Sequence, residues 1–267
     1  MRFCILLLLA SFVVSASPTL LDQGYRAMYN LDFQTAHRDF GTWQKLHPDD
    51  PMGPVSDAAA VLFSEFARMH VLESEFFTKD SSFESHNSHP HADSVARQRF
   101  ENDLIKTRRL AQTILPNLPN DQNALLASVL GQGLHADYLA LIEQRNLAAL
   151  TEMKQSRTMA ERLISQHPNC YDANLAVGIE NYLLSLKPAP IRWVLRLSGA
   201  ETNKESGVEQ LRITAEKGHY LLPYARLLLA VADLRDGNRS GASAKLSWLA
   251  ANFPGNPLYR AELSKLK

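Results

Sequence analysis

The same short stop signal ends three apolar segments of this chain, and it restricts the fold more than any other feature. The signal is a histidine or phenylalanine, then proline, then a small polar residue or glycine, and it stands at 47–49, 167–169 and 253–255. Proline cannot continue a helix, because its ring clashes with the preceding turn and it lacks a backbone N–H. The segment before the first stop places apolar residues such as Ala36 and Phe40 at helical spacing. The stops therefore predict helices that end at regular points along the chain.

Between the stops, turn residues divide the chain further into segments with helical apolar spacing. This arrangement predicts helices in consecutive pairs. No stretch shows the period-two alternation of a strand between turn residues. We expect about five pairs, at residues 19–50, 55–115, 121–166, 171–217 and 221–252, with a short C-terminal segment that caps the stack. Each pair of this kind buries its apolar face only against its neighbours, so the chain should form one cooperative array.

The first pair also matches a known repeat. Gly24, Phe33, Ala36, Phe40 and Pro48 stand at the relative spacings of the tetratricopeptide repeat (TPR). The two small residues would let the helices approach closely, and Phe40 would fill the gap beside them. The segment therefore resembles a TPR, and the resemblance implies an all-α fold in which about five helix pairs form a right-handed superhelix.

The fourth pair is interrupted. Its first helix runs into Lys187-Pro188-Ala189-Pro190, which must break it. Residues 191–197 have the pattern of a short inserted amphipathic helix, and the pair resumes near residue 205. Two interpretations of this insert stay open: it is a packing wedge that bends the stack, or it forms one wall of a binding surface.

Three segments resemble a narrower group of proteins. HADYLALIE, the stretch from YDANLAVGIENYLLSL to SGVEQL, and AEKGHYLLPYARLLLAVA are similar to exported TPR proteins of Gram-negative, Acidobacteria-like bacteria. TPR proteins usually bind peptides in a concave groove lined by the first helix of each pair. The resemblance implies a non-enzymatic scaffold, without a cofactor, that binds a protein or peptide partner in the cell envelope. The side chains that we expect to contact this partner are His135, Tyr138, Asn174, Asn181, Tyr182, Lys187, Arg192, Trp193, Tyr224 and Arg226.

The N-terminus has the composition of a secretory signal peptide. Arg2 precedes an apolar run at residues 3–14, and small residues follow it. The run is shorter than the ~20 residues that span a bilayer, although an uncleaved membrane anchor is the alternative. We expect residues 1–16 to be a signal peptide and residues 17–267 to form a single TPR-like domain. The protein would then be exported to the periplasm or outside the cell.

Charge and cysteine content restrict the partners further. Lysine and arginine number 28 of the 267 residues, and aspartate and glutamate also number 28, so the basic surface of a nucleic-acid-binding protein is not expected. Cleavage of the signal peptide would leave Cys170 as the one cysteine, and no intramolecular disulfide. The insert carries Trp193 between two arginines, as interfacial helices do, so docking on a membrane surface through residues 191–197 is the second hypothesis.

No arrangement of residues predicts an active site. His135 and Asp137 are close on one helix, but the sequence contains no nucleophile elbow. Gly131-Gln132-Gly133 has the letters of a dinucleotide-binding turn, yet it lies inside a helical pattern and does not follow a strand. We expect these glycines to permit close helix packing, and we expect the protein not to be an enzyme.

One polar loop leaves metal binding open. His86, His89 and His91 lie close together in it, and imidazoles at such spacing can ligate zinc or copper. The loop is bounded by serine, asparagine and proline, which is equally typical of a solvated loop without a metal. A small-ligand or metal-binding protein is therefore the third hypothesis.

Overall fold

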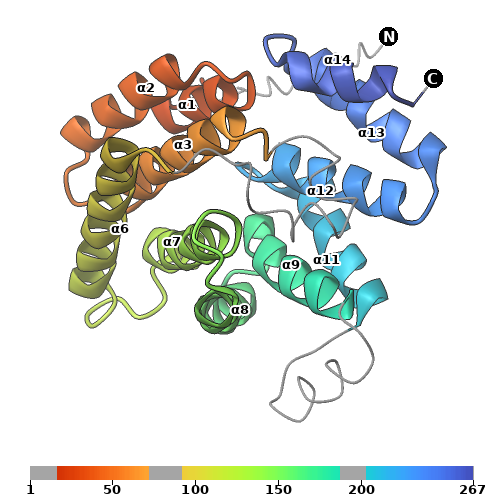
Figure 1. Cartoon of the computed structure of the whole chain (residues 1–267). Helices are drawn as coiled ribbons and strands as arrows, with labels where there is room; N and C mark the ends of the chain where they lie inside the picture. Colours follow the sequence, from red (N-terminus) through yellow and green to blue (C-terminus); the bar gives the residue numbers. More distant parts are fainter. Residues whose placement is uncertain (1–16, 72–91, 187–202, 267) are drawn as a thin grey trace, which may run out of the picture.

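The computed structural model describes residues 17–71, 92–186 and 203–266 (Figure 1). This part of the chain contains eleven α-helices and one short 3₁₀ helix, and it has no strand. The all-α fold predicted from the sequence is therefore confirmed. The predicted signal peptide at 1–16, the histidine loop and the inserted helix at 191–197 lie outside the described residues.

The helices follow the predicted segments closely. Consecutive helices pack against each other along the chain, as in a repeat-like all-α fold. The 3₁₀ helix η2, Tyr171–Ala173, leads directly into α9. The bounds of the α-helices are Leu20–Tyr29 for α1, Phe33–Leu46 for α2, Met52–Arg68 for α3, Ser94–Ile114 for α6, Gln122–Leu141 for α7, Asn146–Gln166 for α8, Asn174–Ser185 for α9, Lys204–Lys217 for α11, Leu222–Arg235 for α12, Arg239–Asn252 for α13 and Pro257–Ser264 for α14.

The three stop signals share one backbone geometry. His47, His167 and Phe253 cap the ends of α2, α8 and α13 with φ of −131°, −131° and −127° and ψ of 69°, 77° and 67°. The following proline disfavours helical dihedrals at the residue before it, which explains why each helix ends there.

The starts of seven helices are also fixed by neighbouring residues, because short polar side chains accept hydrogen bonds from backbone N–H groups of the first turn. These N-caps are Thr19, Asp32, Asp93, Asp121, Asn203, Asn238 and Asn256.

The glycines confirm one packing prediction and contradict another. A Cβ atom on Gly24 would lie 2.3 Å from the Phe40 ring, so α1 and α2 approach as closely as the sequence indicated. A Cβ atom on Gly131 would lie 3.8 Å from its nearest neighbours, and one on Gly133 would lie 3.7 Å from Ser156 Oγ. These are ordinary contact distances. We expected Gly131 and Gly133 to permit close helix packing, but an alanine would fit at either position, so the packing does not depend on them.

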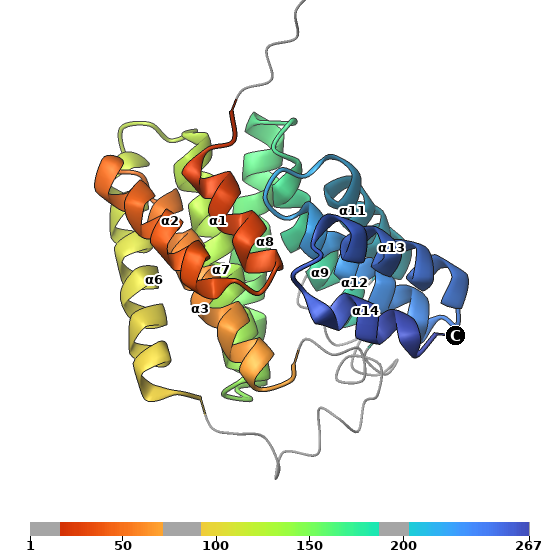
Figure 2. The same cartoon turned by 90° about the horizontal axis from the view of Figure 1, so that it is seen from above.

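The two ends of the described helical stack meet (Figure 2). The Tyr29 hydroxyl of α1 donates a 3.0 Å hydrogen bond to the carbonyl of Tyr220, and the Tyr25 and Tyr220 rings stack with centroids 4.7 Å apart. Asn256 Nδ2 donates to the Tyr29 carbonyl at 3.1 Å. The inner side of α1, which we expected to line an open groove, is therefore covered by residues from the C-terminal part of the chain.

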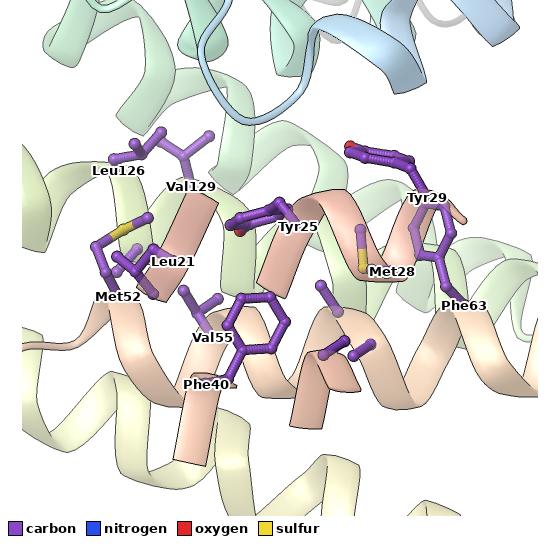
Figure 3. Packing of buried hydrophobic residues seen from close by; sticks show 14 of the residues in the cluster. Leu21, Tyr25, Met28, Tyr29, Phe40, Met52, Val55, Phe63, Leu126 and Val129 are labelled. Carbon is purple, nitrogen blue, oxygen red and sulfur yellow. The ribbon is translucent and has the colours of Figure 1, made fainter. Parts of the chain in front are cut away.

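The largest core cluster joins these ends to the middle of the chain. Its side chains interlock between α1, α2, α3 and α7 and are almost wholly excluded from solvent. Figure 3 labels Leu21, Tyr25, Met28, Tyr29, Phe40, Met52, Val55, Phe63, Leu126 and Val129 in this cluster. Burial of apolar side chains of this size contributes ~1.5–3 kcal/mol each, so the core favours the closed arrangement.

The helices of the described segments are too short or too polar to span a bilayer.

Candidate binding site

Side chains from two helices that are far apart in the sequence, α3 and α12, come together beside the core. The Phe63 ring of α3 and the Tyr224 ring of α12 pack edge to face, with centroids 5.2 Å apart and planes at 72°. Burial raises the pKa of Tyr224 well above its usual value, and the nearby charge of Asp137 on α7 raises it further. We call Phe63, Asp137 and Tyr224 the aromatic–carboxyl site.

Asp137 is the unusual member of this site. Its side chain is partly buried, and burial alone raises the pKa of its carboxyl group to about 7. Among the described residues, no donor lies within hydrogen-bonding distance of this carboxyl and no cation forms an ion pair with it. A carboxyl group that has lost water without gaining a partner is destabilised in its charged form.

The far side of the aromatic rings leaves little room. Phe63 and Tyr224 border a narrow cavity together with Tyr29, Asn256 and Tyr259. Its volume is about 10 Å³, enough for roughly one water molecule. Small-molecule pockets usually enclose ~300–1,000 Å³. A small-molecule ligand therefore could not be enclosed in this cavity.

A wider hollow of about 440 Å³ lies on the surface between the α2–α3 turn and the start of α7. Two of its three carboxylates already have partners. Asp50 accepts hydrogen bonds from Trp43 Nε1 at 3.0 Å and from the Met52 N–H at 3.0 Å. Asp121 caps α7 by accepting the N–H of Ala124 at 2.8 Å. These residues fix the turns, and we do not assign a ligand to this hollow.

Four predicted partner-binding residues lie in the interior. The exposed fractions of Tyr138, Asn174, Asn181 and Tyr182 are 2%, 6%, 0% and 6%. Asn181 Oδ1 accepts a 3.1 Å hydrogen bond from Arg157 of α8, which ties α9 to its neighbour. These side chains lie on faces of the first helices that pack against other helices. We therefore leave them out of the site that we propose below.

Three other predicted residues are partly exposed but face different neighbours. His135 Nδ1 lies 3.3 Å from a carboxylate oxygen of Glu152 on α8. The Arg226 guanidinium lies over the Trp248 ring, 4.0 Å from its centroid. Tyr224 alone belongs to the aromatic–carboxyl site. His135, Tyr224 and Arg226 thus contact different neighbours.

The remaining predicted residues, Lys187, Arg192 and Trp193, lie outside the described residues, and so do the three loop histidines. The membrane-docking and metal-binding hypotheses that rest on them stay predictions. Within the described segments, no group of three or more histidine, cysteine, aspartate or glutamate side chains could hold a metal ion.

A second polar cluster connects α2, α3 and α6, and the sequence did not indicate it. Asp57 of α3 is buried, and its carboxylate lies 2.5 Å from His37 Nδ1 and 2.9 Å from Arg99 Nη2. Burial, and next the negative charge of Asp57, raise the pKa of the neighbouring Asp103 to about 7. The cluster thus contains two carboxyl groups, and that of Asp103 is neutral at moderately acidic pH.

Asp172 is another buried carboxylate that sequence reasoning missed. It accepts backbone N–H groups from three consecutive residues, His219, Tyr220 and Leu221, at 2.9, 2.9 and 3.1 Å. Those residues form the turn into α12, so Asp172 fixes the turn that carries Tyr220 to α1. The sequence shows only that Asp172 stands in the first turn of a helix. It does not reveal that Asp172 binds the turn at residues 219–221.

No family model matches this chain, and a search of curated proteins likewise finds no similar protein. Function is therefore argued from the geometry of these side chains.

Proposed function

We propose that this chain is a non-enzymatic TPR-type scaffold that binds a protein or peptide partner at the aromatic–carboxyl site. The observation that carries the proposal is the edge-to-face pair of the Phe63 and Tyr224 rings, which joins α3 to α12, together with the partly buried Asp137 carboxyl, which has no hydrogen-bond or ion-pair partner among the described residues. Helices packed in consecutive pairs support it, because such arrays present side chains of successive helices along one surface. The leader expected at residues 1–16 would deliver the scaffold to the cell envelope, where its partner would lie.

The shape of the site favours a macromolecular partner over a small molecule. The cavity behind Phe63 and Tyr224 holds roughly one water, so a small ligand could not be enclosed there. A peptide can instead lie along the surface and insert a single side chain beside Asp137. The polypeptide would then gain affinity from contacts on both sides of that inserted group.

The proposal is tested by photo-crosslinking in cells that express the full chain. A benzoylphenylalanine replaces Tyr224, which keeps an aromatic ring in the site. We expect a specific crosslinked protein, identified by mass spectrometry, whose yield falls at least several-fold when Asp137→Asn is added.

The control places the same crosslinker at Leu147, which is 84% exposed near the start of α8. This variant should not yield the same adduct. The proposal is refuted by the absence of any adduct that depends on Asp137, or by an identical set of adducts from position 147.

A further inference from the structure

The C-terminal part of the chain occupies the face of α1 that we expected to line an open groove. The Tyr220 ring, in the turn between α11 and α12, stacks on the Tyr25 ring with centroids 4.7 Å apart. The Tyr220 carbonyl accepts a 3.0 Å hydrogen bond from the Tyr29 hydroxyl. His219 Nε2 lies 2.7 Å from Asp22 Oδ1. The turn thus presents a ring, a carbonyl and an imidazole to α1, as a bound peptide segment would.

We call residues 219–221 the clasp turn. A second turn, between α13 and α14, joins the same helix at its end. The Gly255 N–H donates to Asn30 Oδ1 at 2.9 Å, and Asn256 Nδ2 donates to the Tyr29 carbonyl at 3.1 Å. The helix α1 itself packs closely against α2 and α3, while α11, α12, α13 and α14 pack in succession against one another. The closure is therefore a contact between two packed units, in which turns of one unit meet α1 of the other.

Three features of this contact favour its opening. The Tyr25 hydroxyl accepts a 3.1 Å hydrogen bond from Ser56 Oγ of α3, so it keeps a partner inside its own unit. The His219 side chain is 64% exposed, so water can replace its ion pair. A cavity of about 10 Å³ remains at the joint, bordered by Tyr29 of α1 and Tyr259 of α14. Incomplete packing there gives up part of the dispersion attraction of a closed core.

We propose that the clasp turn is an autoinhibitory contact: it occupies α1 as an internal ligand, and a partner polypeptide with a basic residue directly before an aromatic one displaces it. The partner's ring would stack on Tyr25, and its carbonyl would accept the Tyr29 hydroxyl. Its basic side chain would face Asp22, as His219 does in the closed chain. This inference rests on the proposed function, because it gives that scaffold a sequence preference and a second, regulated surface.

The first test supplies the clasp turn as a separate molecule. The probe is a fluorescent synthetic peptide with the sequence of residues 216–224, and its binding to the full protein is followed by anisotropy. Tyr220→Ser removes the ring of the internal ligand and leaves α1 unchanged. We expect the peptide to bind this release variant ~10-fold or more tightly than wild type, because the internal ligand competes less. Tyr171→Ser is the matched control, since Tyr171 lies on η2, and it should behave as wild type.

Variants of the peptide test the chemistry of the partner. Replacement of its first tyrosine, the equivalent of Tyr220, by serine should abolish binding to the release variant. Replacement of its histidine by lysine should preserve binding, and replacement by glutamate should abolish it, because the group would face Asp22. Asp22→Asn in the release variant should weaken the original peptide by ~2–5-fold, as for loss of an exposed ion pair. Equal affinity of the lysine and glutamate peptides would overturn the basic part of the preference.

The second test locks the contact without changing the clasp turn. A Cβ atom on Gly255 would lie 3.2 Å from Asn30 Cβ, slightly below the ~3.5–4.5 Å of disulfides, so Asn30→Cys with Gly255→Cys should form a bond after a small shift. The natural Cys4 and Cys170 are replaced by serine and alanine in this protein. We expect the peptide to bind the reduced form and to lose ~10-fold or more in affinity after oxidation with glutathione disulfide. If the release variant fails to fold, this comparison decides.

The outcomes separate this inference from the proposed function. Equal affinity of the peptide for the reduced and the oxidised lock, or no binding to any variant, overturns the autoinhibitory contact. The protein crosslinked through position 224 then decides on the proposed function alone. Peptide binding that needs release and is lost in the oxidised lock supports the contact. If no crosslinked protein is found in cells as well, the contact stands and the proposed function is overturned.

Discussion

Replacement of Asp103 by asparagine should stabilise the protein at pH 8 and have little effect near pH 4. The pKa of this carboxyl is about 7 in the folded chain against 3.8 for an ordinary aspartate, chiefly because of burial and then because of the charge of Asp57. The folded state therefore holds a proton that the unfolded state has already lost between these two values. Stability consequently decreases as pH rises from about 4 to about 7, and stays at its lower level above that.

The magnitude follows from the two pKa values. Each pH unit of difference corresponds to ~1.4 kcal/mol, which gives an upper limit of ~4 kcal/mol for the free energy of unfolding. Asp103 is only partly buried and lies near the cations Arg99 and Lys106, so we expect ~1–2 kcal/mol at pH 8. The asparagine amide can still donate to Asp57, as the protonated carboxyl does.

The assay is urea unfolding of wild type and Asp103→Asn, followed by circular dichroism at a series of pH values from 4 to 9. The difference in unfolding free energy should grow between pH 4 and pH 7 and then level off. Asp49→Asn makes the same chemical change on the exposed surface and should show no such growth. A difference that does not change with pH, or a destabilised Asp103→Asn at pH 8, would refute the reasoning.

Three further substitutions test the packing and the site. Gly24→Ala should lower the stability of the protein by ~1–3 kcal/mol, because its Cβ would overlap Phe40. Gly131→Ala should raise it by ~0.5–1 kcal/mol, because an alanine fits there. Thermal unfolding of both variants checks this pair, and equal effects would contradict it. Asp172→Ala should lower the free energy of unfolding by ~2–3 kcal/mol, because three N–H groups lose their acceptor. Urea unfolding measures this loss, and an unchanged stability would show that water replaces the carboxylate. Asp137→Asn should raise stability at pH 8 but not at pH 4, since the pKa of about 7 lies above the unfolded value; loss of stability at pH 8 would reveal an internal partner.

Local features of the fold could be predicted from the sequence. The stop at His47-Pro48 ends α2 where expected, because proline acts on the residue just before it. The close approach at Gly24 was also predictable, since Phe40 stands at the repeat spacing within the same pair. Each of these effects involves residues in one pair of helices, and such pairs are visible in a single sequence.

Contacts between distant pairs could not be predicted in this way. Polarity alone suggested that Asn181 lines a groove, but its helix face is covered by neighbours, and it is 0% exposed. Asp57 and Asp103 belong to different helices, and no periodicity indicates that their carboxyl groups meet. Asp137 was noted only beside His135, while its relation to Tyr224 depends on how α7 and α12 lie in the folded chain.

The meeting of the two ends has a consequence for the evolution of the chain. An open array of helix pairs can gain or lose a unit at either end, because a terminal unit touches one neighbour only. Here the Tyr29 carbonyl of α1 accepts a hydrogen bond from Asn256, and the Tyr29 hydroxyl donates to the carbonyl of Tyr220 before α12, so a helix pair inserted between these segments would separate the partners. Duplication of a unit would therefore cost the core contacts of α1 as well.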